Sequence, residues 1–177
     1  MKKVLLTLVA VFALSMSVKA QGNFEVGAAI GFPTADAADL SDFMIAIDAY
    51  YMFKQEDAFI NLGPTVGFRN FFTKDIEGGV PTLPLPGIPE QFDTIEIDNG
   101  TFITVGAAGR VTIFGTLRGG ADAGYAIGLT DIVDGGFYFR PMVGIDILDT
   151  LELNAAYETI WDKVTWGSFQ IGAKLEF

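Results

Sequence analysis

The feature that most constrains this chain is an alternation of apolar residues with small or polar ones, which recurs in eight separate runs. In the first run, Phe24, Val26, Ala28, Ile30 and Phe32 occupy every second position. The runs cover residues 23–32, 43–53, 60–70, 103–113, 117–129, 137–147, 151–161 and 167–177. Successive side chains of a β-strand point to opposite faces, so each run predicts a strand with one apolar face. A length of about 9 to 13 residues suits a tilted strand that crosses a bilayer, and is roughly twice that of a strand in a soluble domain.

The charged residues indicate which face of each strand meets lipid. None lies on the apolar faces, and the opposite faces carry five basic and seven acidic residues: Glu25, Asp48, Arg69, Arg110, Arg118, Asp122, Arg140, Asp146, Glu152, Glu158, Lys174 and Glu176. A soluble barrel would place apolar side chains inside and charges outside. Here charges of both signs share a face with Gly, Ala, Ser and Thr, which predicts an ion-paired lumen inside an apolar belt. The expected fold is all-β, an eight-stranded antiparallel up-and-down transmembrane β-barrel.

The connections between the runs alternate between short and long. Short ones are 54–57, the neighbourhood of Gly115, and 149–150, whereas the long ones are 33–42, 73–100, 130–136 and 162–166. Outer-membrane barrels have short periplasmic turns and long extracellular loops, so both termini are expected on the periplasmic side.

Aromatic and proline residues add detail to this arrangement. Tyr51, Phe53 and Phe177 are expected near the periplasmic edge of the belt, and aromatic residues also approach the outer edge: Phe32, Phe43, Phe68, Phe137, Phe139 and Trp161. Pro64 and Pro141 fall inside predicted strands, where each removes a hydrogen-bond donor. We expect either a bulge at each proline or a strand boundary that lies elsewhere.

The first twenty residues have the pattern of a secretory signal peptide. Lys2 and Lys3 precede a run of 13 apolar-rich residues, 4–16, and small residues at Val18 and Ala20 predict cleavage after Ala20. The run is shorter than the roughly 20 residues of a membrane-spanning helix. The sequence thus predicts a signal peptide at 1–20 and one barrel domain at 21–177. Removing the signal changes the net charge from −11 to −14, which argues against a nucleic-acid partner.

The predicted leader, the eight alternating runs and the final strand, 169–177, resemble the small outer-membrane barrels of the OmpA and OmpX kind. The resemblance implies a bacterial outer-membrane location, and outer-membrane lipid and lipopolysaccharide as the surroundings of the belt. It also implies that Phe177, which ends an amphipathic strand, is the signal that the barrel-assembly machinery reads.

Little in the sequence favours catalysis. The chain has no Cys and no His, which excludes zinc-thiolate sites and His-dependent triads. Glu152 and Glu158 share a strand face but lie roughly 20 Å apart along it, too far for a cooperating pair. The segments 98–100 and 131–135 have ordinary turn chemistry and match no EF-hand loop. We therefore expect no enzyme activity, no cofactor and no metal.

The longest loop, 73–100, is the candidate surface for an extracellular ligand, because four prolines in it alternate with Leu83, Leu85 and Ile88. The leading hypothesis is a structural or surface-interaction protein with a plugged, ion-paired lumen, acting through acidic extracellular loops. A narrow channel or carrier for small solutes is the alternative, and a barrel-embedded enzyme is the third.

Overall fold

The computed structural model describes residues 22–53, 59–74, 98–148 and 150–177 of the chain. The predicted signal peptide with its cleavage site, the turn at 54–57 and most of the loop 73–100 lie outside these ranges. The strands are β1 (Gly22–Thr34), β2 (Ser41–Phe53), β3 (Asn61–Thr73), β4 (Gly100–Ile113), β5 (Leu117–Gly128), β6 (Gly135–Leu148), β7 (Leu151–Trp161) and β8 (Thr165–Glu176). A short helix, α2 (Ala37–Leu40), connects β1 to β2. No helix among the described residues is long and apolar enough to cross a membrane.

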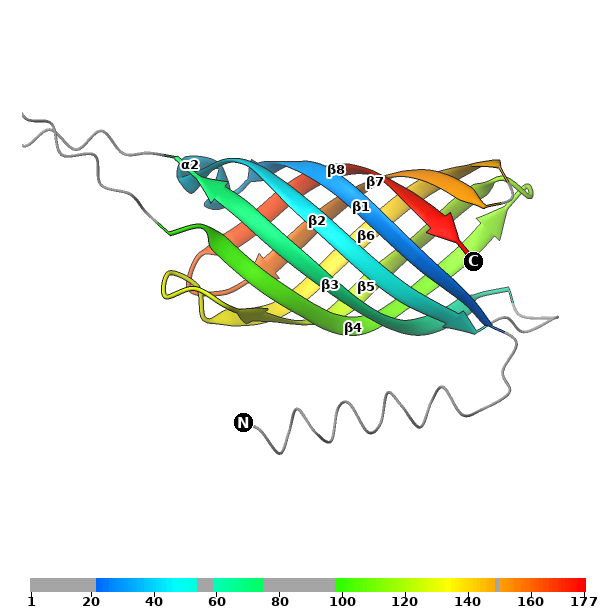
Figure 1. Ribbon diagram of the computed structural model, residues 1–177, viewed down its shortest axis with the longest axis horizontal. Coiled ribbons are helices and arrows are strands. Elements are labelled where there is room, and N and C mark those ends of the chain that lie inside the picture. Colours follow the sequence, from blue (N-terminus) through cyan, green and yellow to red (C-terminus); the bar gives the residue numbers. More distant parts are fainter. Residues whose placement is uncertain (1–21, 54–58, 75–97, 149) are drawn as a thin grey trace, which may run out of the picture.

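The eight strands form one closed, antiparallel barrel in sequence order (Figure 1). The sheet closes where β1 pairs with β8, from Glu25↔Glu176 to Thr34↔Gly167. Closure leaves no free sheet edge, so the backbone donors and acceptors of the strands are paired within the barrel. The predicted fold class, strand number and strand order are confirmed.

The two faces of the sheet carry opposite chemistry. Apolar side chains on the outer face are exposed, as at Ile30 (60%) and Leu62 (59%), whereas Arg69 (1%) and Glu158 (0%) are buried inside. The six aromatic residues expected near the outer edge all lie on the outer face, and two pairs stack there: Phe43 on the neighbouring Phe72, and Phe137 on Trp161. This inverted distribution is the one predicted for a barrel in lipid.

The two ends of the barrel differ. One end, called here the terminal end, holds Gly22, Phe177 and the tight hairpin 114–116 (Figure 1). The other, called here the α2 end, holds α2 and the connections 129–134 and 162–164. The six-residue connections 35–40 and 129–134 lie at the α2 end, as the spacing of the runs predicts. The connection 162–164 at the same end has only three residues, as many as the hairpin 114–116, because β8 begins at Thr165 rather than at Gly167.

The bulges expected at Pro64 and Pro141 are wrong. The pairing of β3 with β2 passes from Tyr50↔Thr65 to Phe53↔Leu62 without a change of register, and Pro64 remains opposite Ala107 on its other side. Likewise Pro141 pairs in register with Ala121, and the ladder with β7 skips only Arg140 and Pro141. A missing donor thus interrupts one ladder locally, and the register holds because the second ladder is intact. Register shifts occur instead near the strand ends, between Ser41 and Phe43 and between Asp146 and Leu148.

Replacing Ile171 with arginine tests the lipid-facing position of the outer surface. Ile171 lies midway along β8 and is 54% exposed. An arginine facing the middle of a bilayer costs about 2–4 kcal/mol, so Ile171→Arg should lower the free energy of unfolding by about that amount. Urea unfolding of the protein in lipid vesicles measures the change, and Ile171→Val is the control. An arginine variant as stable as the control would contradict a lipid-facing position.

Candidate functional site

The barrel interior is the candidate site, because it gathers all eleven predicted lumen residues and Glu176. The predicted residues are Glu25, Asp48, Arg69, Arg110, Arg118, Asp122, Arg140, Asp146, Glu152, Glu158 and Lys174, and each takes part in at least one ion pair. They form two groups, one in the middle of the barrel and one near the terminal end. A third, apolar group fills the interior toward the α2 end.

The central group is electrically balanced, with three arginines and three carboxylates. Arg69 of β3 bridges Asp48 at 2.9 Å and Glu158 at 2.8 Å. Arg140 of β6 contacts Asp48 at 2.7 Å and Asp122 at 2.9 Å, and Arg110 of β4 contacts Asp122 at 2.6 Å. Because every one of these side chains is buried, each charge is compensated by a partner on another strand.

Neutral polar side chains complete the central group. Gln170 donates to Glu158 at 3.2 Å and accepts from Arg140 at 3.3 Å. The Tyr50 hydroxyl donates to Asp122 and accepts from Arg140, and the Arg110 guanidinium lies 5.2 Å from the centre of the Tyr50 ring. Neither Tyr50 nor Gln170 was singled out from the sequence. They could have been found from the sequence, because both occupy inward-facing positions of β2 and β8.

The group near the terminal end has an excess of acid. Arg118 contacts four carboxylates: Glu176 at 2.8 Å, Asp146 at 2.9 Å, Glu25 at 3.2 Å and Glu152 at 3.6 Å. Lys174 joins Glu25 at 2.7 Å and Glu152 at 3.2 Å. Four carboxylates thus meet two cations. Among the described residues, no group of three or more Asp and Glu side chains is placed to hold a metal ion.

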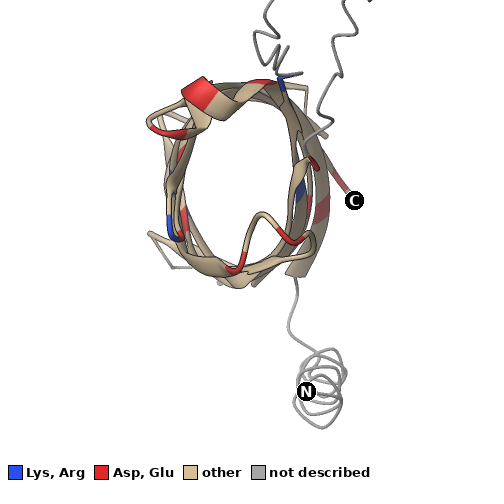
Figure 2. Ribbon diagram, turned by 90° about the vertical axis from the view of Figure 1, so that its left-hand side faces the viewer, with Lys and Arg blue, Asp and Glu red and all other residues tan. Residues whose placement is uncertain are grey.

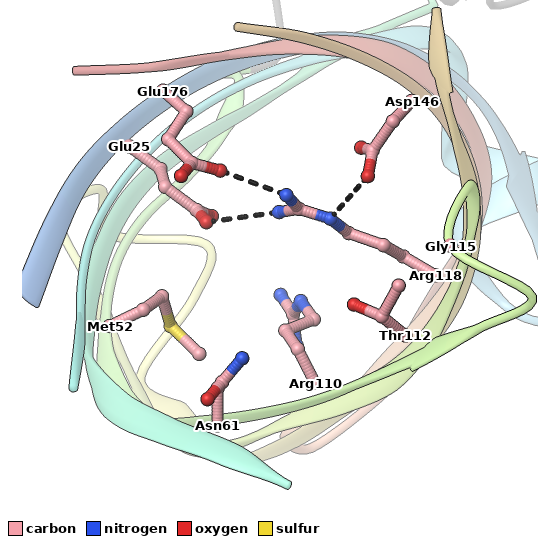
Figure 3. Close-up of a pocket in the computed structure, with 9 residues that line it drawn as sticks. All are labelled: Glu25, Met52, Asn61, Arg110, Thr112, Gly115, Arg118, Asp146 and Glu176. Carbon is pink, nitrogen blue, oxygen red and sulfur yellow. Dashed lines mark hydrogen bonds and ion pairs between the residues drawn. The ribbon is translucent and has the colours of Figure 1, made fainter. Parts of the chain in front are cut away.

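A cavity of about 250 Å³ adjoins this acidic group (Figure 3). Glu25 and Glu176 reach toward Arg118 from one wall, while Arg110 and Asn61 project from another. Polar atoms of both signs line the cavity, so it suits water and small hydrophilic solutes rather than apolar ligands.

An apolar group blocks the interior nearer the α2 end. Phe71, Phe102 and Trp166 pack edge to face, with ring centroids 5.1–6.1 Å apart, and their rings are almost fully buried. Met44, Tyr138 and Ile160 belong to the same buried cluster. We call Phe71, Phe102 and Trp166 the aromatic plug. This layer was not predicted, because the three residues each lie one position outside the predicted runs 60–70, 103–113 and 167–177. In the observed strands all three face inward.

The α2 end carries mostly acidic residues around its rim (Figure 2). Several of them order the connections: Asp36 accepts from the Thr165 backbone at 2.8 Å, and Asp162 from the Asp134 backbone at 3.0 Å. The exposed Lys163 ammonium pairs with Asp134 at 2.7 Å, and this hydrogen bond raises the pKa of Lys163.

Comparisons with known proteins agree with this architecture. No protein-family model and no curated protein matches the sequence. The N-terminal β-barrel domain of Pseudomonas aeruginosa OprF is similar in structure, with a TM-score of 0.55 and 13% identity over 90% of this chain and 100% of that one. Ail, the attachment invasion locus protein of Yersinia pestis, gives a TM-score of 0.53 and 14% identity over 90% and 100%. The fold is that of a small outer-membrane β-barrel.

A designed protein has a similar barrel fold. A de novo designed transmembrane β-barrel has a TM-score of 0.52 and 14% identity over 88% of this chain and 96% of that one. Identities this low establish the fold alone, and a fold hosts unrelated functions. The function of this barrel must therefore be argued from its own interior and ends.

The Arg69–Glu158 pair allows a quantitative test of the barrel interior. Arg69→Met leaves Glu158 buried without its cation, so we expect a loss of about 3–5 kcal/mol in the free energy of unfolding. Adding Glu158→Gln should recover part of that loss, and a double-mutant cycle gives the coupling energy. Lys163→Ala removes an exposed ion pair and is the control with little expected change. Strictly additive losses would show that the two side chains do not stabilise each other.

Proposed function

We propose that this protein is a closed barrel of the bacterial outer membrane, acting as a structural or surface-interaction protein. The observation that carries the proposal is the filled interior, in which the aromatic plug covers a balanced layer of buried ion pairs. An eight-stranded barrel has an interior just wide enough for side chains. A closed interior serves as an anchor, and leaves the ends of the barrel to meet partners.

The orientation follows from the lengths of the connections. The terminal end, with its short turns, faces the periplasm, and the α2 end faces the outside. The acidic connections there, together with the loop 73–100, form the face that meets an extracellular ligand. Hydrogen bonds hold the base of that loop. The Asn99 side-chain oxygen accepts from the Thr73 backbone N–H at 3.2 Å, and the Asn99 backbone carbonyl accepts from the Thr130 hydroxyl at 2.8 Å.

The same proposal includes the export and assembly of the barrel. The signal peptide is removed after Ala20, the belt is surrounded by outer-membrane lipid and lipopolysaccharide, and the barrel-assembly machinery reads Phe177. Phe177 suits such recognition, because its side chain is 74% exposed while its backbone N–H donates to Phe24 at 2.8 Å.

Phe177→Ala should therefore reduce assembly more than stability. We expect a lower yield of folded protein in the outer-membrane fraction, but little change in the unfolding free energy of purified, refolded protein. The difference in gel mobility between unboiled and boiled samples measures the folded fraction. Phe169→Ala, which removes another exposed ring from β8, is the control. Equal effects of the two substitutions on yield would argue against a special role for Phe177.

The second candidate function is a narrow channel or carrier for small solutes. The cavity of about 250 Å³ near the terminal end favours it, since it brings polar space to Arg110 and Arg118. A permeating ion would still have to pass the central ion pairs and the aromatic plug.

Conductance across a planar lipid bilayer distinguishes the two candidates. We expect the purified native protein to insert without discrete current steps at low or high salt, because the plug excludes water from the path. Insertion is verified by protease resistance of the barrel in the same lipid. Reproducible single-channel openings would overturn the closed-barrel proposal and favour the channel.

A further inference from the structure

A small apolar pocket opens at the α2 end, above the aromatic plug. Its volume is about 230 Å³, and Leu40, Ile132, Val164 and the buried ring of Trp166 contribute apolar walls. Asp39 and Lys74 stand at its margin. Small-molecule sites usually measure about 300–1,000 Å³, so this pocket is sized for a single apolar side chain rather than a larger ligand.

The indole of Trp166 lines the pocket and is almost fully buried. Trp166 is 1% exposed, and its Nε1–H has no hydrogen-bond partner within the described structure. The benzene edge of the ring packs on Gly100, where an added Cβ would lie 2.6 Å from Cη2 and Cζ3. The nitrogen lies on the edge of the ring opposite Gly100 and is itself buried. The ring therefore contributes an apolar wall to the pocket.

The rim of the pocket selects the charge of what enters it. The described residues of the α2 end include seven aspartates and two lysines: Asp36, Asp39, Asp42, Asp98, Asp131, Asp134, Asp162, Lys74 and Lys163. Both lysines are already engaged, Lys74 with the Ala38 carbonyl at 2.7 Å and Lys163 with Asp134 at 2.7 Å. The rim therefore presents an excess of negative charge to an approaching molecule (Figure 2).

We propose that the α2 end binds a basic peptide segment of a partner protein, with one apolar side chain anchored in the Trp166 pocket. The anchor side chain packs against the apolar walls, and flanking lysine or arginine side chains face the aspartates. This combines the usual parts of a protein interface, a desolvated anchor inside a polar and electrostatically complementary rim. The inference rests on the proposed exposure of the α2 end outside the cell, and names the class of partner that this end takes.

Intrinsic fluorescence of Trp166 tests the proposal directly. The chain has two tryptophans, so Trp161→Phe leaves Trp166 as the reporter. The protein is placed in phosphatidylcholine nanodiscs and titrated with a short capped peptide in which leucine is flanked on each side by two lysines. We expect a saturable change in Trp166 emission that weakens as salt is raised. Alanine in place of the leucine should weaken binding by about tenfold or more, as expected for methyl groups lost from an apolar pocket.

Matched variants separate pocket binding from attraction to any acidic surface. Val164→Phe fills the pocket and should abolish the saturable change, whereas Val143→Phe makes the same substitution on the lipid-facing surface and should bind as the parent does. Unboiled gel mobility verifies that both variants fold, and empty nanodiscs report binding to lipid. Equal affinity of the Val164→Phe variant, or equal binding of a peptide with glutamates in place of the lysines, would overturn the proposal.

The outcome is independent of the conductance measurement. If the barrel neither conducts nor binds the lysine peptide, the peptide-binding proposal is refuted and the closed-barrel proposal is retained. If the barrel conducts and also binds the lysine peptide, the closed-barrel proposal is refuted and the peptide-binding proposal is retained.

Discussion

Every backbone hydrogen bond that faces hydrocarbon must be made within the protein, and here the pairing of β1 with β8 meets that requirement. Without it, both strands would present a row of unpaired groups to lipid. The pairing runs from Glu25↔Glu176 to Thr34↔Gly167, so it joins residues from the two ends of the barrel domain. Closure at eight strands also sets the width of the interior, and that width determines what the inward-facing residues must do.

A narrow interior forces buried charges to find partners across the barrel. Glu158 of β7 lies opposite Arg69 of β3, and Arg118 of β5 reaches Glu25 of β1. Each such pair ties strands that share no backbone ladder. Removing one partner from such a pair is strongly destabilising, even where the intact pair adds little net stability. The small residues between the charges leave room for the long arginine side chains.

The alternation of the sequence was sufficient to predict the strands, their number and the inverted faces, because period two is a local property of each run. The partners of each charge were not predictable, since Arg69 and Glu158 are 89 residues apart and meet only through the stagger of the closed barrel.

The aromatic plug was missed for a different reason. Phe71, Phe102 and Trp166 each lie one residue outside the predicted runs 60–70, 103–113 and 167–177. The pattern of the sequence therefore did not place them in the lumen. The bulge expected at Pro64 does not form, because the ladder to β4 preserves the register there.

The interior is also polarised along the barrel axis. The central layer is balanced, so the whole excess of lumen acid lies near the terminal end, where Glu25, Asp146, Glu152 and Glu176 share Arg118 and Lys174. That excess is tolerable because the adjoining cavity admits water, which screens the uncompensated charge. At the α2 end the aromatic plug replaces water above the balanced layer, and the low dielectric there strengthens the ion pairs beneath it. The interior thus holds a polar, acidic cavity toward the terminal end and a buried apolar layer toward the α2 end. The apolar walls that an anchoring side chain requires lie beside this apolar layer, in the pocket at the α2 end.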